Sequence, residues 1–363
     1  MSYRTALAYL AKQTATVELS NRSGGRAAVC PLWNGQVMTS CCDGFDSESF
    51  GFINVAEIDK RTPEKTICNF GGEDIWTITP VAAAYEIEND SSSEVVLTAA
   101  VNASDANGKA VRFQLKRTVS LLDSIDINAA FGSYFSSGTA AAAGMTNTAA
   151  IAERLNESNV LSVGFVTHNA VRSNDEAVVS SRMRGMFNAA GHTAVIVPVI
   201  HDEDEESDKF PYRLDFLGAS PHQRIRHLSD KLLFAADGEG RCQLSLRRNN
   251  AAAVVGSIEF RSGTLTLWTF QNNSREPVAG GQSPALESFL RFTNYGKRDT
   301  GIAGTMKCYE VNSFSSPQDL YPDEELVYRQ YTLHISAENG VLNEIMQSVF
   351  AVTYQQVYDK MNL

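Results

Sequence analysis

Short stretches in which apolar and polar residues alternate recur along nearly the whole chain. Residues 110–122 show the pattern most clearly, with Val111, Phe113 and Leu115 separated by single polar residues. A period of two is typical of a β-strand that buries one face. Turn signals rich in Gly, Asn and Asp separate the stretches, and neither a strand–helix alternation nor a glycine-rich nucleotide-binding motif accompanies them. The chain is therefore predicted to be an all-β sandwich of mostly antiparallel sheets.

Two hairpins can be placed from local patterns. The Asn34-Gly35 pair predicts a tight turn between strands at residues 27–32 and 36–42. Farther along, strands at residues 95–103 and 110–122 are separated by a short polar loop that contains Asn-Gly. Both arrangements favour antiparallel neighbours in one sheet.

A few short helices complete the predicted elements. Residues 2–13 form an amphipathic pattern in which Leu7, Leu10 and Ala11 share one face. In the second half of the chain, only residues 341–349 have a helical spacing of apolar side chains. These helices are expected to cover the edges or faces of the sheets.

The chain is long enough for one large β domain. It has 363 residues, of which 43% are hydrophobic and 20% are charged, as in an ordinary globular protein. No linker rich in Pro or Ser divides it. We expect a single domain over residues 1–363, with the N-terminal helix inside residues 1–15, present as a monomer or a homodimer.

Charge and hydropathy narrow the classes of partner and location. The formal net charge is −11, which argues against a partner that is a nucleic acid or an anionic membrane, since both require a basic face. No run of about 18 apolar residues predicts a transmembrane helix. The apolar block at residues 6–11 is too short for a secretory signal, so a cytoplasmic location is expected.

The cysteines and acidic residues give no clear metal signal. None of the six cysteines has the spacing of a metal site, and no metal ligand is predicted among them. Cys41 and Cys42 are adjacent in a predicted strand, so at most one is expected to face the core. The acidic run at residues 201–208 is interpreted as an exposed loop, with a metal cluster as the alternative.

One stretch combines features that a sugar-sized polar ligand requires. Residues 71–76 place two glycines beside Glu73, Asp74 and Trp76, and the upstream segment that begins at Asn34 ends in small polar residues. Carboxylates, amides and an aromatic face are typical contacts of such ligands. A solvated hairpin is the alternative interpretation of the same residues.

Aromatic and basic residues elsewhere extend this candidate site. Trp33, Trp76 and Trp268 are candidate stacking platforms, although each could equally be a buried residue between two sheets. Arg182 and Arg184 share one face of a predicted strand that is too polar for a core. That face is expected to point into a cleft or into solvent.

Several segments, in the same order, resemble an uncharacterised bacterial family of galactose-mutarotase-like (aldose 1-epimerase-like) proteins. The resemblance covers most of the chain and implies a β-supersandwich. It is carried by Gly35-Gln36-Val37-Met38-Thr39-Ser40, Ser49-Phe50-Gly51-Phe52-Ile53-Asn54, Phe70-Gly71-Gly72-Glu73-Asp74-Ile75-Trp76, Arg184-Gly185-Met186-Phe187-Asn188, residues 308–317, residues 320–324 and residues 331–335.

The resemblance implies a sugar bound in a cleft of the sandwich and acid/base interconversion of its anomers. In mutarotases a carboxylate base removes the anomeric proton while an imidazolium protonates the ring oxygen, and neither a metal nor an organic cofactor is required. The position that matches the base is Glu310, and the nearest counterpart of the acid is His168. Each also has a structural alternative: an ion pair with an arginine for Glu310 and a strand-end hydrogen bond for His168.

The chain departs from the family pattern at three positions. Ile75 stands where the pattern has Arg, Gln243 where it has Lys, and Gln282 where it has Asp. Gln243 and Asn34 stay among the candidate substrate-binding residues. Because charged residues are missing from the expected cleft, a non-catalytic carbohydrate-binding protein that keeps the fold is the alternative function.

Overall fold

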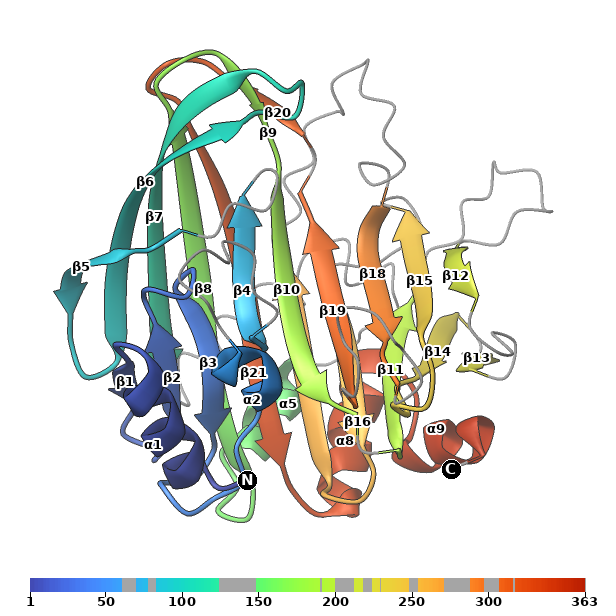
Figure 1. Cartoon of the computed structure of the whole chain (residues 1–363). Helices are drawn as coiled ribbons and strands as arrows, with labels where there is room; N and C mark the ends of the chain where they lie inside the picture. The colour runs from blue at the N-terminus through green and yellow to red at the C-terminus, as the bar shows by residue number, and fades with distance from the viewer. Residues whose placement is uncertain are drawn as a thin grey trace.

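The computed structural model consists of two large β-sheets stacked face to face (Figure 1). It describes residues 1–60, 70–77, 83–123, 148–189, 191–199, 212–217, 224–228, 230–247, 254–270, 288–296, 307–315 and 317–362. The paired strands of both sheets run antiparallel, for example β10 with β19 and β7 with β8. The predicted fold class, all-β with mostly antiparallel sheets and a few helices, is confirmed.

The first sheet carries the candidate site and lies in front in Figure 1. It has nine strands within the described residues, and strands distant in sequence lie side by side at its centre. In spatial order they are β1 (Val17–Ser20), β2 (Arg26–Cys30), β3 (Gln36–Cys41), β4 (Gly72–Thr77), β10 (Ser181–Asn188), β19 (Cys308–Phe314), β18 (Ser288–Asn294), β15 (Cys242–Arg247) and β12 (Tyr212–Leu217).

The second sheet lies behind the first and has ten strands within the described residues. A separate two-stranded ribbon pairs β9 (Ala177–Val179) with β20 (Gln318–Leu320). In spatial order the strands of the second sheet are β13 (Ile225–Leu228), β14 (Lys231–Ala235), β11 (Thr193–Pro198), β16 (Val254–Glu259), β17 (Thr264–Phe270), β21 (Glu325–Ser336), β8 (Leu161–Ser173), β7 (Ala110–Leu122), β6 (Glu94–Ser104) and β5 (Glu86–Asp90).

The inner faces of the two sheets form the core. On β7, Val111, Phe113 and Leu115 point inward, and the polar residues between them point outward. Residues of both sheets meet in two clusters, one of which joins Val37 of β3 to Phe165 of β8. The period of two in the sequence therefore corresponds to burial between the sheets.

Two helices cover part of the outer face of the nine-stranded sheet. α1 (Tyr3–Gln13) and α2 (Val55–Asp59) pack over β1, β2 and β3, in a cluster that includes Tyr3, Met38 and Ile58 (Figure 1). No helix of the described residues covers the outer face from β4 onward. That part of the sheet is where polar side chains collect.

Three further helices cover one half of the outer face of the ten-stranded sheet. They are α5 (Thr148–Leu155), α8 (Asn339–Phe350) and α9 (Tyr354–Met361). Ile345 and Val349 of α8 pack with Leu265 and Leu333 of the sheet. The other half of that face, over β8, β7 and β6, carries polar side chains instead.

Several local predictions are confirmed. Asn34 and Gly35 both have φ of 57°, which is the conformation that a tight Asn-Gly hairpin turn requires. The predicted strands 95–103 and 110–122 form the hairpin of β6 and β7. The helix at 341–349 is the centre of α8.

The N-terminal helix is confirmed, and its buried face agrees with the predicted one at Leu10, with Leu7 packed against the same cluster, but not at Ala11. Ser2 caps its start, because its hydroxyl oxygen accepts a hydrogen bond from the backbone N–H of Thr5. The buried residues are Tyr3, Ala6 and Leu10, whereas Ala11 is exposed. The sequence interpretation considered aliphatic side chains only, whereas the structure also buries Tyr3, the aromatic residue that follows the cap.

Two other predictions were wrong. α9 was missed because it buries only Val357 and Met361, so its apolar pattern is weak; its capping box of Thr353 and Gln356 was the signal available in the sequence. Cys41 and Cys42 are both buried. β3 is covered by α1 on one side and by the second sheet on the other, so both of its faces are apolar.

Candidate functional site

Strand β19 places Glu310 on the outer face of the nine-stranded sheet. Its neighbours Tyr309 and Val311 point into the core between the sheets. Side chains alternate along a strand, so Glu310 and Asn312 point to the opposite side. This face lies beyond the area covered by α1 and α2 (Figure 1).

Glu310 forms a buried charge pair with Arg184 of β10. The Arg184 Nη1 atom lies 3.8 Å from Glu310 Oε1, and the side chains are only 4% and 11% exposed. The amide of Asn312 donates a long hydrogen bond of 3.5 Å to Glu310 Oε2. A carboxylate this buried requires a cation or several donors nearby, and Arg184 supplies the cation.

Tyr295, which follows β18, is the third neighbour of the carboxylate. Its hydroxyl hydrogen-bonds to Glu310, and its pKa is raised well above the ordinary value by burial and by the Glu310 charge. The guanidinium carbon of Arg241 lies 5.8 Å from the centre of the Tyr295 ring. The phenol is therefore a neutral donor at ordinary pH.

The strand register aligns further polar residues with this pair. Arg184 is paired with Asn312, and Asn312 with Arg291 of β18. Glu310 is paired with Thr293, which in turn is paired with Gln243 of β15. The Thr293 hydroxyl donates to Gln243 Oε1 at 3.3 Å, so the polar surface extends over four strands.

An aromatic residue ends the same face. Phe314, the last residue of β19, is half-buried and is the register partner of Arg182. The guanidinium carbon of Arg291 lies 5.1 Å from the centre of the Phe314 ring. Phe314 and Arg291 were missed in the sequence, although Arg291 alternates with core residues at the same period of two as Arg182 and Arg184.

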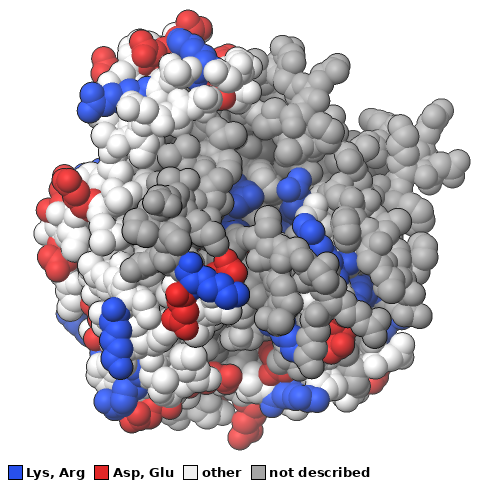
Figure 2. All heavy atoms as spheres, viewed as in Figure 1, with Lys and Arg blue, Asp and Glu red and all other residues white. Residues whose placement is uncertain are grey.

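Two candidate site residues, Asp74 and Trp76, lie on β4, the strand next to β10. Asp74 is the register partner of Arg184, and Trp76 is that of Arg182. Their side chains lie outside the described residues. Figure 2 shows basic side-chain atoms in the middle of this face, in the region of β10 and β18. The structure thus brings Arg182, Arg184, Gln243 and Glu310 onto one surface.

Glu73 points the other way, into the space between the sheets. Its Oε2 accepts hydrogen bonds from Thr332 Oγ1 at 2.7 Å and from Gln330 Nε2 at 3.2 Å, both on β21 of the second sheet. His334 Nε2 lies 3.8 Å from Glu73 Oε1. The carboxylate therefore links the two sheets and is separated from the surface that carries Glu310.

Asn34 also lies away from that surface. It is 4% exposed, and its Oδ1 accepts a hydrogen bond of 3.2 Å from the backbone N–H of Ala83. Its backbone carbonyl accepts from the buried guanidinium of Arg117 on β7. These contacts hold the β2–β3 turn against the second sheet.

His168 lies on the outer face of the ten-stranded sheet. Its register partners are Arg329 on β21 and Thr118 on β7, whereas Phe165 and Val171 on the same strand face the core. Partial burial, and secondarily the charge of Arg329, lower the pKa of its imidazole below the ordinary value. The imidazole is accordingly neutral near pH 7.

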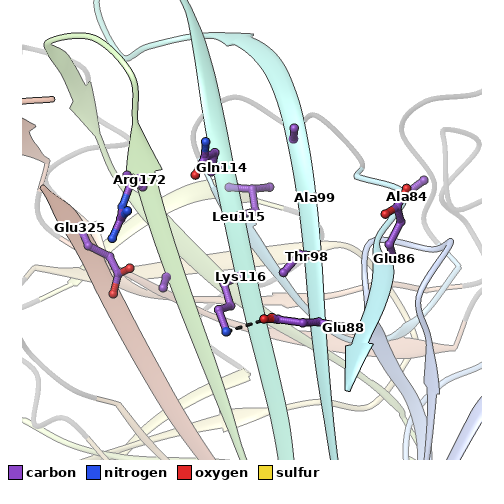
Figure 3. Close-up of a pocket in the computed structure, with 12 residues that line it drawn as sticks. Ala84, Glu86, Glu88, Thr98, Ala99, Gln114, Leu115, Lys116, Arg172 and Glu325 are labelled. Atoms are coloured by element: carbon purple, nitrogen blue, oxygen red, sulfur yellow. Dashed lines mark ion pairs between the residues drawn. The ribbon is translucent and has the colours of Figure 1, made fainter. Parts of the chain in front are cut away.

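The face that holds His168 has a hollow of its own. A cavity of about 630 Å³ lies over β5 to β8 and the start of β21. Figure 3 shows Lys116 paired with Glu88 across it, and the distance between the two charged groups is 2.9 Å. Arg172 and Glu325 lie on neighbouring strands at its other side (Figure 3).

His168 and Glu310 therefore do not form an acid/base pair. Both sheets lie between them, because each side chain is on the outer face of a different sheet. A ligand that contacts Glu310 on one sheet cannot also contact His168 on the other. The sequence interpretation placed both on strands correctly, but one sequence does not reveal which sheet each strand joins.

A variant of His168 tests this placement. His168→Gln is expected to leave the surface around Glu310 unchanged. It should also flatten the pH dependence of stability. The pKa of His168 is lower in the folded state than in the unfolded state, so the neutral imidazole favours the folded wild type above about pH 6.5. The wild type loses this stabilisation as pH falls. Melting temperatures between pH 5 and pH 8 measure the difference. Equal slopes for both proteins would contradict the assignment.

The remaining candidates are placed as follows. Trp33 and Trp268 are 7% and 1% exposed and belong to core clusters, which is the structural alternative for both. Gln282 and the acidic run at 201–208 lie outside the described residues. Among the described residues, no group of three or more His, Cys, Asp or Glu side chains is arranged to hold a metal ion. Within the same part of the chain, no helix is long and apolar enough to cross a membrane.

The model of one protein family matches almost the whole chain. A family model described as "Family of unknown function (DUF6786)" matches residues 1–361. The chain belongs to this family. No curated protein matches the sequence of this family member.

Solved structures of similar shape include galactose mutarotase-like proteins. A GalM/aldose epimerase homologue from C. elegans has 9% identity and a TM-score of 0.49, with 90% of this chain and 100% of that chain covered. A galactose mutarotase-like protein from Lactobacillus casei has 11% identity and a TM-score of 0.46, with 89% and 99% covered. The Slr1438 protein from Synechocystis has 9% identity and a TM-score of 0.49, with 90% and 96% covered. The resemblance to galactose mutarotase-like proteins that was expected from the sequence is found in the fold alone.

Proposed function

We propose that the chain is a carbohydrate-binding protein whose site surrounds Glu310 and Arg184 on the outer face of the nine-stranded sheet. The observation that carries the proposal is the charge pair itself, buried and flanked by amide and hydroxyl groups. Carboxylate, guanidinium, amide and phenol groups are complementary to sugar hydroxyls. We also propose that the site binds without interconverting anomers.

Within the part of the chain that the structure describes, no suitable acid lies near Glu310, and this supports binding over catalysis. Anomer interconversion requires an acid whose pKa is near the working pH. The cation facing Glu310 is an arginine, which is not deprotonated in proteins, and the pKa of Tyr295 is raised. None of the four histidines in the described residues lies on this face: His168 and His227 belong to the second sheet, His334 is between the sheets, and His192 precedes β11 and contacts Arg261.

Thermal melting against a panel of mono- and oligosaccharides tests the proposal, with Glu310→Gln alongside the wild type. A ligand at about 100 times its Kd stabilises the folded state by about 2.7 kcal/mol, so the matching sugar should raise the melting temperature of the wild type by a few degrees. Glu310→Gln keeps the shape but removes the charge, and the shift should largely disappear. If no sugar shifts the wild type, the proposal is wrong.

Polarimetry separates binding from turnover. A freshly dissolved α-anomer of the bound sugar should mutarotate at its spontaneous rate in the presence of the protein. An acceleration that Glu310→Gln abolishes would show that the site is catalytic and would restore the epimerase interpretation. Glu73→Gln is the matched control, since that carboxylate lies between the sheets.

A further inference from the structure

The cavity on the outer face of the ten-stranded sheet is a second candidate binding site, on the opposite side of the molecule from Glu310. Its volume is about 630 Å³, and all the residues that line it belong to the described part of the chain. The floor is low because short side chains stand on two of its strands, Thr98 and Ala100 on β6 and Ala170 on β8. Longer side chains from β5, β7, β8 and β21 surround this floor (Figure 3).

The strand register sets two rows of side chains across the cavity. Gln114 of β7 is paired with Arg172 of β8 on one side and with Ala100 of β6 on the other. In the next row, Thr98 of β6 is paired with Glu86 of β5. The rows therefore place a carboxylate on the β5 wall and a guanidinium on the β8 wall, with a carboxamide between them.

The two walls carry opposite charges that a ligand can reach. Glu88 of β5 is paired with Lys116 at 2.9 Å. Glu86 and Arg172 are both exposed, and within the described residues neither takes part in an ion pair. The remaining charge is Glu325, the register partner of Arg172, which lies on the side of β8 away from Glu86. A ligand with a cation at one end and an anion at the other is complementary to this arrangement.

The spacing of the strands sets the length of that ligand. β5 and β8 are three strand intervals apart, which corresponds to about 14 Å between their backbones at about 4.8 Å each. The charges of a single amino acid are too close together to reach both walls. An extended chain of three residues spans about 10 Å, which leaves room for a charged side chain to meet each end.

We propose that this cavity binds a short extended peptide of about three residues with both termini free. The N-terminal ammonium group pairs with Glu86. The C-terminal carboxylate accepts forked hydrogen bonds from the guanidinium of Arg172, whose planar geometry matches a carboxylate. Gln114 and Thr98 offer a carboxamide and a hydroxyl to the peptide groups between the termini.

Calorimetric titration with four probes tests the proposal: trialanine with free termini, N-acetylated trialanine, trialanine amide and alanine. Trialanine should bind about fivefold more tightly than either blocked peptide, because each block removes one solvent-exposed charge pair. Equal binding of the amide would overturn the recognition of a carboxylate, and equal binding of alanine would overturn the length. No binding of trialanine at millimolar concentrations would overturn the site as a whole.

Variants assign each terminus of the peptide to its wall. Glu86→Gln should weaken trialanine about fivefold and leave the acetylated peptide unchanged, and Arg172→Gln should do the same with the amide as the unchanged probe. Glu325→Gln should tighten the binding of trialanine, because it removes a carboxylate that repels the C-terminus. Arg329→Gln, an exposed arginine of the same sheet outside the cavity, is the control. Equal weakening of trialanine and the acetylated peptide by Glu86→Gln would contradict the proposal.

The peptide site and the sugar site are tested independently, because they lie on the outer faces of different sheets. Glu310→Gln should remove the sugar-dependent shift in melting temperature and leave the affinity for trialanine unchanged. Arg172→Gln should have the reverse effect, and the melting temperatures of the free variants show that they are folded. Loss of trialanine binding in Glu310→Gln would contradict the placement of the peptide in this cavity.

Discussion

Arg184→Met is expected to abolish sugar binding and to lower the free energy of unfolding by about 3–5 kcal/mol at pH 7, because it leaves the buried Glu310 carboxylate without its cation. Methionine keeps much of the length of the arginine stem, so the packing changes little. Chemical denaturation gives the stability, and calorimetric titration gives the binding. Arg329→Met is the matched control, since that arginine is exposed on the other sheet.

The double variant Arg184→Met with Glu310→Gln separates charge from packing. Removing both charges eliminates the unpaired carboxylate, so the double variant should be more stable than Arg184→Met alone. It should still bind no sugar, because neither charged group remains. A double variant as unstable as the sum of the two single variants would show that the pair is not coupled.

The paired acids of the glycine-rich stretch show where sequence interpretation succeeds and where it fails. Glu73 and Asp74 are adjacent on β4, and adjacent positions of a strand belong to opposite faces of its sheet. That separation could have been predicted once the segment was assigned as a strand. The partners of Glu73 could not, because Thr332 lies 259 residues farther along the chain and on the other sheet.

Because side chains alternate along a strand, residues two positions apart could be predicted to lie on the same face. Arg182 and Arg184 share a face by period alone, and the structure keeps them on one surface with Glu310. The pairing of His168 with Glu310 required knowledge of which strands join which sheet. This depends on contacts between distant segments, such as β10 between β4 and β19, and the order of strands in a sandwich is not encoded in local pattern.

A close contact with the backbone of Phe52 explains why position 71 is a glycine. Adding a single methyl group there is expected to lower the folding stability strongly. Gly71 has φ of 102°, and an added Cβ would lie 1.7 Å from the carbonyl oxygen of Phe52. The same carbonyl accepts a hydrogen bond of 2.8 Å from the backbone N–H of Gly72. The contact fixes the start of β4, which pairs with β10 and so positions Arg184.

Gly71→Ala is therefore expected to cost about 4 kcal/mol or more of folding stability, since the backbone must move to relieve the overlap. It should also weaken sugar binding, because the displacement is transmitted through β4 to Arg184. Gly108→Ala is the control: its φ of 84° is equally unfavourable for alanine, but no atom lies within 4 Å of the added Cβ. That variant should lose only about 1–2 kcal/mol from backbone strain. Urea unfolding of the two variants measures the difference, and equal losses would show that the approach of Phe52 to Gly71 does not constrain β4.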